Sequence, residues 1–188
     1  MLSIFRGIES WRTEEAGLLT IWQPAPFLLS AAANALTELK QGPAPFIVFH
    51  IRGGDKYVED MQLHRKSATP KALVEAFQKM QPSLQGGSCL LIGDDSSLIL
   101  EAQELAQTKL GCHVMTRGAQ TGGKHVQDDF NRLPEDKRCA ATQRLIVDIE
   151  LMAQADYFVG SQTSGMYHLA SRLRKVIYNK PRTTSVSP

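Results

Sequence analysis

Short apolar runs alternate with longer amphipathic segments along most of this 188-residue chain, and that alternation limits the possible folds more than any other feature. Five runs have the length and the flanking Gly, Pro or Asp residues of buried strands: Phe46–Ile51, Cys89–Ile92, His113–Met115, Tyr157–Val159 and Val176–Tyr178. Five segments repeat apolar residues at helical spacing: Pro26–Lys40, Pro70–Gln81, Ser97–Leu110, Lys137–Ala153 and Ser164–Leu173. Strands that alternate with helices through short connections lie parallel, so the pattern predicts an α/β fold with a doubly wound, mostly parallel sheet.

The length and the 43% content of hydrophobic residues suit one domain with a full core. We predict an N-terminal helical segment over residues 1–42, a Rossmann-like domain over residues 43–179 and a flexible tail over residues 180–188. The first 25 residues, with Trp11 and Trp22, either form a contact surface for a partner or pack on the domain. The polar stretch Arg117–Asp136 has little periodicity, which indicates either a functional lid or a disordered loop.

Charge and composition argue against several classes of partner. The net charge of +2 comes with no clustered basic stripe, so we expect no nucleic-acid partner. Arg6, Glu9 and Arg12 interrupt the apolar N-terminus, and no stretch approaches the ~20 apolar residues of a membrane span, so we expect neither a signal peptide nor a membrane segment. Cys89 and Cys112 lie in apolar runs and are expected as buried thiols. A complete chain of this kind would be cytoplasmic.

Polar residues follow three of the predicted strands, at the edge where open α/β sheets bind ligands. The first strand leads into Arg52 and a Gly-Gly pair, and strand alternation places His50 on the same face as Arg52. A cation at a strand end, followed by glycines, suits the close approach of an anion. Alternatively, Arg52 is internal scaffolding and His50 is a hydrogen-bonded core histidine. The scaffold partner would be Asp55, Asp94 or Asp95.

Three further features each allow a functional and a structural interpretation. Ser161–Ser164 opens a helix, so it forms either a phosphate cradle or an ordinary N-cap. Asp94 and Asp95 could hold Mg²⁺, but a third carboxylate is missing, and we favour a helix cap or a ribose contact. Asp148 falls on the apolar stripe of its helix, and a buried carboxylate needs donors from an internal Arg or Lys or from a ligand.

Motifs of several common enzyme classes are absent. No strand is followed by GxGxxG, and GxxxxGK[ST], GxSxG and DxD do not occur. These absences disfavour a dinucleotide oxidoreductase, a P-loop enzyme and a serine hydrolase.

Three segments resemble the motifs of the GDP-fucose-dependent α1,6-, α1,2- and protein O-fucosyltransferases. FIVFHIRGGDK resembles the first motif, a strand followed by His-x-Arg and, in several branches, by Asp-Lys. IGDDSSLILEA resembles the second-strand motif, and RLIVDIELMAQADYFVGSQTS resembles the third, an Asp-bearing helix, a strand start and a Ser/Thr turn. The segments keep the family's order and similar spacing across Phe46–Leu173, although Gly53 stands where the α1,6- and α1,2-enzymes have a second Arg.

The resemblance implies the C-terminal, Rossmann-like donor-binding half of a two-domain GT-B-type glycosyltransferase. Such an enzyme is inverting and needs no divalent metal, so we expect GDP-fucose as the donor substrate, no cofactor and no metal site. The acceptor would be a glycan or a protein. The chain would act with an N-terminal acceptor domain or as a homo-oligomer, and a fragment of a larger enzyme would belong to the Golgi or the ER lumen.

The resemblance also implies roles for the residues at the strand ends. Arg52 would hold the β-phosphate and stabilise the departing GDP, while Thr163 and Ser164 would bind the diphosphate. His50 and Asp148 would bind guanine, because the Asp148 carboxylate can accept hydrogen bonds from both N1–H and the exocyclic amino group.

The remaining roles concern the pocket and the sugar. Asp95 would contact or organise the nucleotide pocket, and Lys56 with Asp60 would face the sugar and the acceptor. Arg52 and Asp60 are thus the candidate catalytic residues. Two alternatives stay open: a non-catalytic module that binds nucleotide sugars, and a Mg²⁺-dependent phosphotransferase or phosphatase that uses Asp94 and Asp95.

Overall fold

The computed structural model describes residues 17–40, 44–53, 69–118, 126–180 and 183–186. Its centre is a five-stranded sheet in the order β3-β2-β1-β4-β5, and every neighbouring pair is parallel. The strands are β1 (Phe46–Ile51), β2 (Ser88–Gly93), β3 (His113–Gly118), β4 (Tyr157–Ser161) and β5 (Thr183–Val186). The predicted α/β class and parallel sheet are therefore confirmed.

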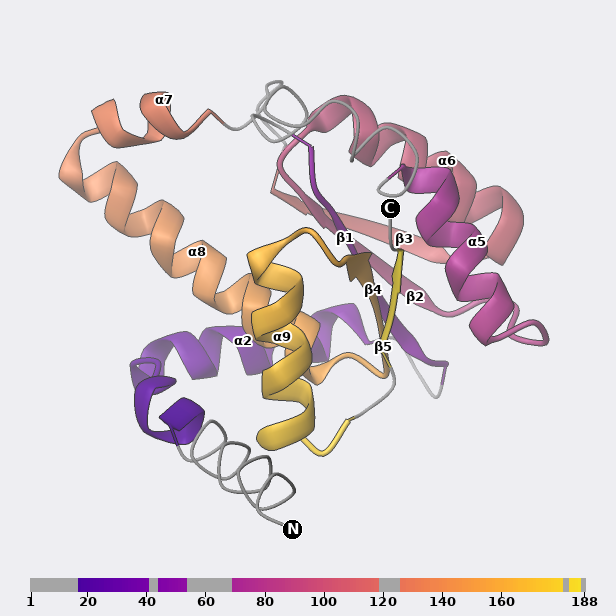
Figure 1. Cartoon of the computed structure of the whole chain (residues 1–188), viewed down its shortest axis with the longest axis horizontal. Coiled ribbons are helices and arrows are strands. Elements are labelled where there is room, and N and C mark those ends of the chain that lie inside the picture. Colours follow the sequence, from indigo (N-terminus) through magenta and orange to yellow (C-terminus); the bar gives the residue numbers. More distant parts are fainter. Residues whose placement is uncertain (1–16, 41–43, 54–68, 119–125, 181–182, 187–188) are drawn as a thin grey trace, which may run out of the picture.

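Helices cover both faces of the sheet (Figure 1). One layer contains α2 (Pro26–Leu39), α8 (Glu135–Gln154) and α9 (Gly165–Val176), and the other contains α5 (Pro70–Met80) and α6 (Ser96–Leu110). Each face of the sheet has its own hydrophobic core, and side chains of β1 alternate between the two. Phe46 and Val48 pack against the first layer, and Ile47 and Phe49 pack against the second. The short helix α7 (Gln127–Arg132) and the exposed first half of α8 project beyond the sheet. None of the described helices combines the length and apolarity needed to cross a membrane.

Local sequence explains where α5 and α6 begin. Thr69 caps α5 by accepting a hydrogen bond from the Ala72 N–H at 3.2 Å, and Pro70 occupies the first turn, where its missing N–H costs nothing. Asp95 caps α6 in the same way. Burial of Leu73 and Phe77 then fixes which face of α5 meets the sheet.

The fifth strand was predicted in the wrong place. Val176–Tyr178 continues and ends α9, since the Ile177 N–H donates to the Leu173 carbonyl at 2.8 Å. The true edge strand is β5, which lies in the tail that we expected to be flexible. A three-residue apolar run cannot distinguish a strand from a helix end by periodicity, and Thr183–Val186 becomes a strand by pairing with β4.

Two other predictions need correction. Cys89 and Cys112 are buried, but a disulfide joins them across 23 residues, so they are not free thiols. The stretch Arg117–Asp136 is not one long loop, because it contains the end of β3, all of α7 and the start of α8, while residues 119–125 lie outside the described residues.

The N-terminal segment packs on the domain as far as it is described. Leu18 and Trp22 contact the core under α2 and α8. The Trp22 indole N–H donates to Glu150 Oε1 at 2.7 Å, which satisfies part of a buried carboxylate. Trp11 lies outside the described residues.

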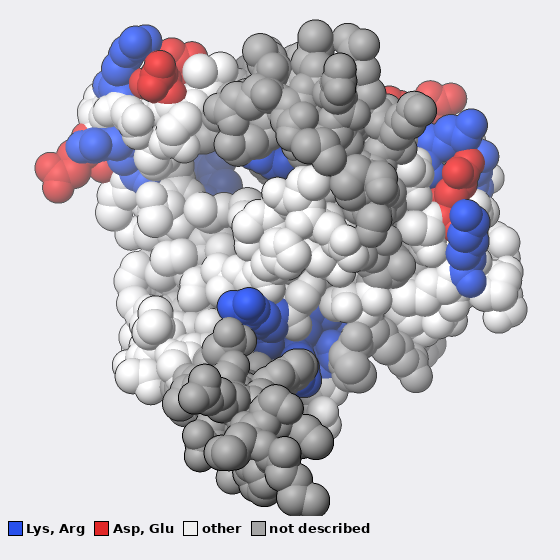
Figure 2. Space-filling view, viewed as in Figure 1, with Lys and Arg blue, Asp and Glu red and all other residues white. Residues whose placement is uncertain are grey.

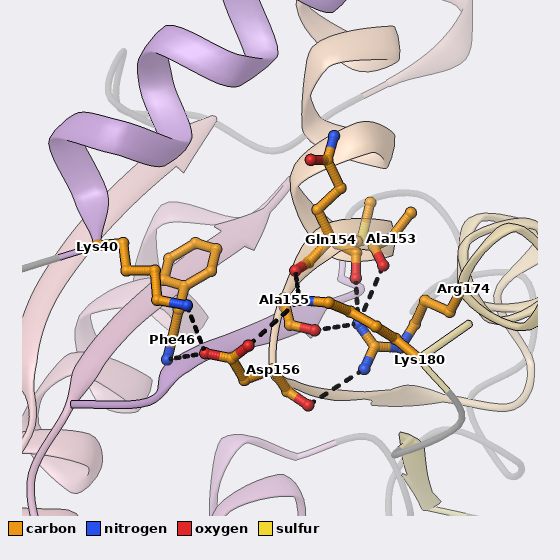
Figure 3. A network of polar contacts seen from close by, with 9 residues as sticks. Lys40, Phe46, Ala153, Gln154, Ala155, Asp156, Arg174 and Lys180 are labelled. Carbon is orange, nitrogen blue, oxygen red and sulfur yellow. Dashed lines mark hydrogen bonds and ion pairs between the residues drawn. The ribbon is translucent and has the colours of Figure 1, made fainter. Parts of the chain in front are cut away.

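A polar network closes the amino ends of β1 and β4 (Figure 3). The fully buried Arg174 donates to the carbonyl oxygens of Met152, Ala153, Ala155 and Asp156 at 2.7–3.3 Å. These groups include the last carbonyls of α8, which have no partner inside the helix. The Asp156 carboxylate accepts from the Phe46 N–H at 3.0 Å and pairs with Lys40 and Lys180, each at 3.2 Å.

Candidate functional site

The carboxyl ends of the strands meet at one edge of the sheet. In the register, His50 of β1 lies opposite Ile92 of β2 and Gly160 of β4, and Ile92 lies opposite Arg117 of β3. These four residues form a row across the sheet on the face covered by α8 and α9, because Val48, two residues before His50, packs in that layer. The row is the floor of the candidate site.

Arg52 extends from the end of β1 and forms an ion pair with Asp94, which follows β2. Asp94 also accepts from the Gly53 N–H at 2.6 Å, so it joins the ends of the two strands. The partner that the scaffold interpretation requires is therefore present. The Arg52 side chain nevertheless keeps 21% of its surface exposed at the edge where a ligand would arrive.

Asp95 is a helix cap, as we favoured. Its Oδ1 accepts from the Ser97 N–H at 3.0 Å and the Ser97 hydroxyl at 2.5 Å. A Cβ atom at Gly53 would lie 2.6 Å from the Asp95 Cβ, so the close packing of the two strand ends excludes a side chain there. This contact accounts for the glycine at position 53.

His50 is buried beneath the site, with 2% of its surface exposed. Its Nδ1 has no hydrogen-bond partner among the described residues. Burial, and then the charge of Arg52, lower the pKa of His50 to about 4, so the imidazole is neutral at physiological pH. Tyr167 of α9 lies close by, since a Cβ at Gly160 would be 2.8 Å from its ring and 3.5 Å from the His50 Cβ.

Asp148 is buried on the sheet-facing side of α8, and an internal arginine supplies its donor. The Arg117 Nε donates to Asp148 Oδ1 at 2.7 Å. Burial raises the pKa of Asp148, while the hydrogen bond and charge of Arg117 and the charge of Arg144 lower it, and the balance stays above the ordinary value. Sequence reasoning missed Arg117 because it placed residue 117 in a loop. Extending the alternation of His113 and Met115 by one step would have found it.

The turn between β4 and α9 presents hydroxyl groups and a helix start. Ser164 occupies the N-cap position of α9, but its side chain makes no cap hydrogen bond. Ser164 is buried, and the Ser161 and Thr163 hydroxyl oxygens lie 2.8 Å apart. The first N–H groups of α9 thus have no acceptor in the N-cap side chain, which favours the anion cradle over ordinary capping.

Two predicted site residues, Lys56 and Asp60, lie outside the described residues. The structure therefore brings His50, Arg52, Asp95, Ser164 and their neighbours to one edge without placing the sugar-facing groups. Within the described residues, no group of three or more His, Cys, Asp or Glu side chains could hold a metal ion. Figure 2 shows Lys or Arg side chains deep in a hollow beside the projecting end formed by α7 and α8.

Comparison with known proteins adds evidence on the fold. No protein-family model matches the chain, and neither does any curated protein. Crystal structures of POFUT1 do match it: one in complex with GDP-fucose has a TM-score of 0.55 at 12% identity, and one in complex with GDP has 0.53 at 15%. The chain has a fucosyltransferase-like fold. Each match covers 86% of this chain but only 46% or 47% of POFUT1, so the chain spans less than half of that protein's length.

Proposed function

We propose that the chain binds a GDP-sugar, GDP-fucose, as the donor-binding half of a fucosyltransferase-like glycosyltransferase or as a reduced relative of one. One observation carries the proposal: a fucosyltransferase-like fold presents a cation, an uncapped helix start and two buried polar side chains at a single sheet edge. POFUT1 was crystallised with GDP and with GDP-fucose. The diphosphate and the base of a GDP-sugar each have a chemical counterpart at this edge.

The diphosphate would lie between Arg52 and the start of α9. A guanidinium forms charge-assisted hydrogen bonds with phosphate, and the first N–H groups of α9 add the positive end of the helix dipole. Ser164 and Thr163 contribute hydroxyl groups to the same turn. Because the Arg52 guanidinium has several N–H donors, it could contact the diphosphate while it keeps its ion pair with Asp94.

Guanine would bind over the row on the sheet, between His50 and Asp148. The base has two adjacent donors, N1–H and the exocyclic amino group, and an ionised carboxylate offers two acceptor oxygens. Neutral His50 can donate or accept one further hydrogen bond. Adenine and uracil lack this pair of donors, so the arrangement selects guanine.

The rest of the pocket would be organised around Asp95. By capping α6 and packing on Gly53, Asp95 holds the ends of β1 and β2 together. Lys56 and Asp60 are proposed to face the sugar and the acceptor. The alternative Mg²⁺-dependent phosphatase or phosphotransferase is poorly supported, because Asp94 and Asp95 already accept from protein donors.

In transfer, the bond between the fucosyl carbon and the β-phosphate oxygen breaks as the acceptor hydroxyl attacks from the opposite face. Negative charge then develops on the departing GDP. A cation already held in place by Asp94 stabilises that charge without reorganising, so Arg52 and the start of α9 would supply the positive field and no metal is needed. The acceptor proton goes to a base, for which Asp60 is the candidate in this chain.

Replacing Arg52 tests the assignment. Arg52→Ala should weaken GDP binding about thirtyfold, or about 2 kcal/mol, because a charge-assisted contact to the diphosphate is lost. Guanosine, which has no phosphate, should bind the variant and the wild type equally in calorimetric titrations. The exposed Arg172 of α9 provides the control, and Arg172→Ala should change neither affinity. Equal loss of guanosine and GDP, or failure of Arg52→Ala to fold, would make Arg52 scaffolding.

A further inference from the structure

The base pocket contains one ion pair that the proposed function does not assign. Arg117 is the penultimate residue of β3, and Asp148 lies in α8, 31 residues later in the chain. The two side chains meet through Arg117 Nε and Asp148 Oδ1 at 2.7 Å. Asp148 is 7% exposed and Arg117 is 29% exposed, so the pair lies at the boundary between the core and the site.

The geometry of this pair leaves acceptor capacity on Asp148. Arg117 engages Oδ1 alone, and among the described residues no other donor to either oxygen is found. A carboxylate has about four lone-pair sites on its two oxygens, so one bond through Nε leaves room for two more donors. Arg117 therefore holds the Asp148 carboxylate in place and leaves it able to accept further hydrogen bonds.

We propose that Arg117 is a positioning residue of the base pocket, which holds Asp148 as an oriented acceptor for the adjacent N1–H and 2-amino donors of a 2-amino-6-oxopurine base. This inference rests on the proposed function, and it assigns base selectivity to a pair of residues instead of to Asp148 alone. Arg117 acts through Asp148 and touches no reacting atom. Without it, burial would raise the pKa of Asp148 further and favour the protonated form, which offers one acceptor fewer.

The charged and titratable groups around Asp148 support this role. Arg117 on β3 and Arg144 on α8 both favour the ionised carboxylate. His50 on β1 is neutral, and Tyr167 is the titratable residue that α9 brings beside the row. The charged residues of α2 are Glu38 and its cap Lys40, in the last turn next to the amino end of β1. Arg117 is thus the one direct hydrogen-bond donor to Asp148 within the described residues.

A double-mutant cycle tests the inference. GDP, IDP (which lacks the 2-amino group) and ADP are titrated into the wild type, Arg117→Met, Asp148→Asn and the double variant from about pH 6 to about pH 8.5. Affinities are divided by the wild-type value at each pH, which cancels the titration of the nucleotides themselves. Arg117→Met should lose about tenfold in GDP affinity at the acidic end, because Asp148 loses both the hydrogen bond that orients it and the positive charge that opposes its protonation. The loss should shrink as the pH rises.

In the Asp148→Asn background, removing Arg117 should have almost no further effect on GDP, since the group it acts through is gone. Arg132→Met is the matched control, because Arg132 is exposed on α7 and pairs only with Asp129 at 3.5 Å in the described structure. Arg117→Gln provides a second neutral variant that keeps a donor, and it should show the same pH trend if Arg117→Met does not fold.

The outcomes separate the inference from the proposed function. If the wild type does not prefer GDP to ADP, the proposed function fails. If it does, and Arg117→Met and Arg117→Gln bind GDP like the wild type at every pH, Arg117 has no positioning role and the function stands. An equal loss with and without the Asp148 carboxylate would also overturn the inference, because Arg117 would then act on its own.

Discussion

Buried polar residues differ at the two ends of the sheet. At the amino ends, Arg174 donates to four carbonyl oxygens, and Asp156 accepts from a backbone N–H and two lysines (Figure 3). At the carboxyl edge, the buried His50 Nδ1 has no partner among the described residues, and Asp148 receives one side-chain donor. Spare acceptor capacity on a buried carboxylate suits the donors of a ligand, so Asp148 supports the proposed site at the carboxyl edge.

Asp156 should therefore affect stability and not binding. Burial raises its pKa, but the hydrogen bonds from the Phe46 N–H, Lys180 and Lys40 outweigh burial and leave the pKa below the ordinary value of 3.8. A carboxyl group with a lowered folded-state pKa stabilises the protein above about pH 3.8 and loses that contribution as the pH falls through the folded-state value. Asp156→Asn should lower the free energy of unfolding at neutral pH by about 1 kcal/mol, with a smaller difference in acid.

Urea denaturation at several pH values measures this difference. Asp136→Asn is the control, because Asp136 is exposed at the start of α8 and its contact with Lys137 is 3.9 Å long. A stability difference for Asp156→Asn that does not depend on pH would show that the carboxylate charge has no part in the network.

At the scale of elements, the sequence was sufficient wherever apolar periodicity extended over several turns. The predicted Pro70–Gln81 and Ser97–Leu110 helices match α5 and α6 within one residue at each end. Thr183–Val186 was missed because four polar or small residues form a strand only when β4 offers its edge. Val176–Tyr178 was misassigned because Tyr178 was counted as an apolar strand residue. In the structure it follows α9, and its hydroxyl donates a hydrogen bond to Glu150 of α8.

The same reasoning explains which parts of the site could be predicted. Arg52, Ser164 and Asp95 follow strand ends, so their common edge follows from parallel pairing alone. The sequence could not identify Arg117 as the hydrogen-bond donor to Asp148. Arg117 lies 31 residues away, on a strand whose last residues were not recognised. The pairing of Cys89 with Cys112 likewise depends on β2 and β3 being neighbours, which local pattern does not reveal.

At the scale of the whole molecule, the chain contains the proposed nucleotide-binding edge and spans less than half of the POFUT1 chains that it matches. Transfer requires the acceptor hydroxyl to be held in line with the sugar carbon, and such positioning is worth several kcal/mol of the barrier. We propose that a second domain or partner supplies this positioning.

The chain alone should consequently bind GDP-fucose but hydrolyse it at most slowly, with transfer restored by an N-terminal partner or extension. Release of GDP, with and without glycan or peptide acceptors, measures the reaction. Efficient transfer by the chain alone would contradict this division of labour and would direct attention to Lys56 and Asp60 as the acceptor site.

The central claim is that the carboxyl edge of the sheet selects guanosine diphosphate and its sugar conjugates. Thermal unfolding with GDP, GDP-fucose, UDP and ADP tests this claim most directly. At ~100 times its dissociation constant, a ligand of the native state adds about 2.7 kcal/mol to the free energy of unfolding. GDP and GDP-fucose should each raise the melting temperature accordingly, UDP and ADP at the same concentration should raise it far less, and EDTA should change none of these shifts. Equal shifts with UDP, or shifts that disappear in EDTA, would contradict the account.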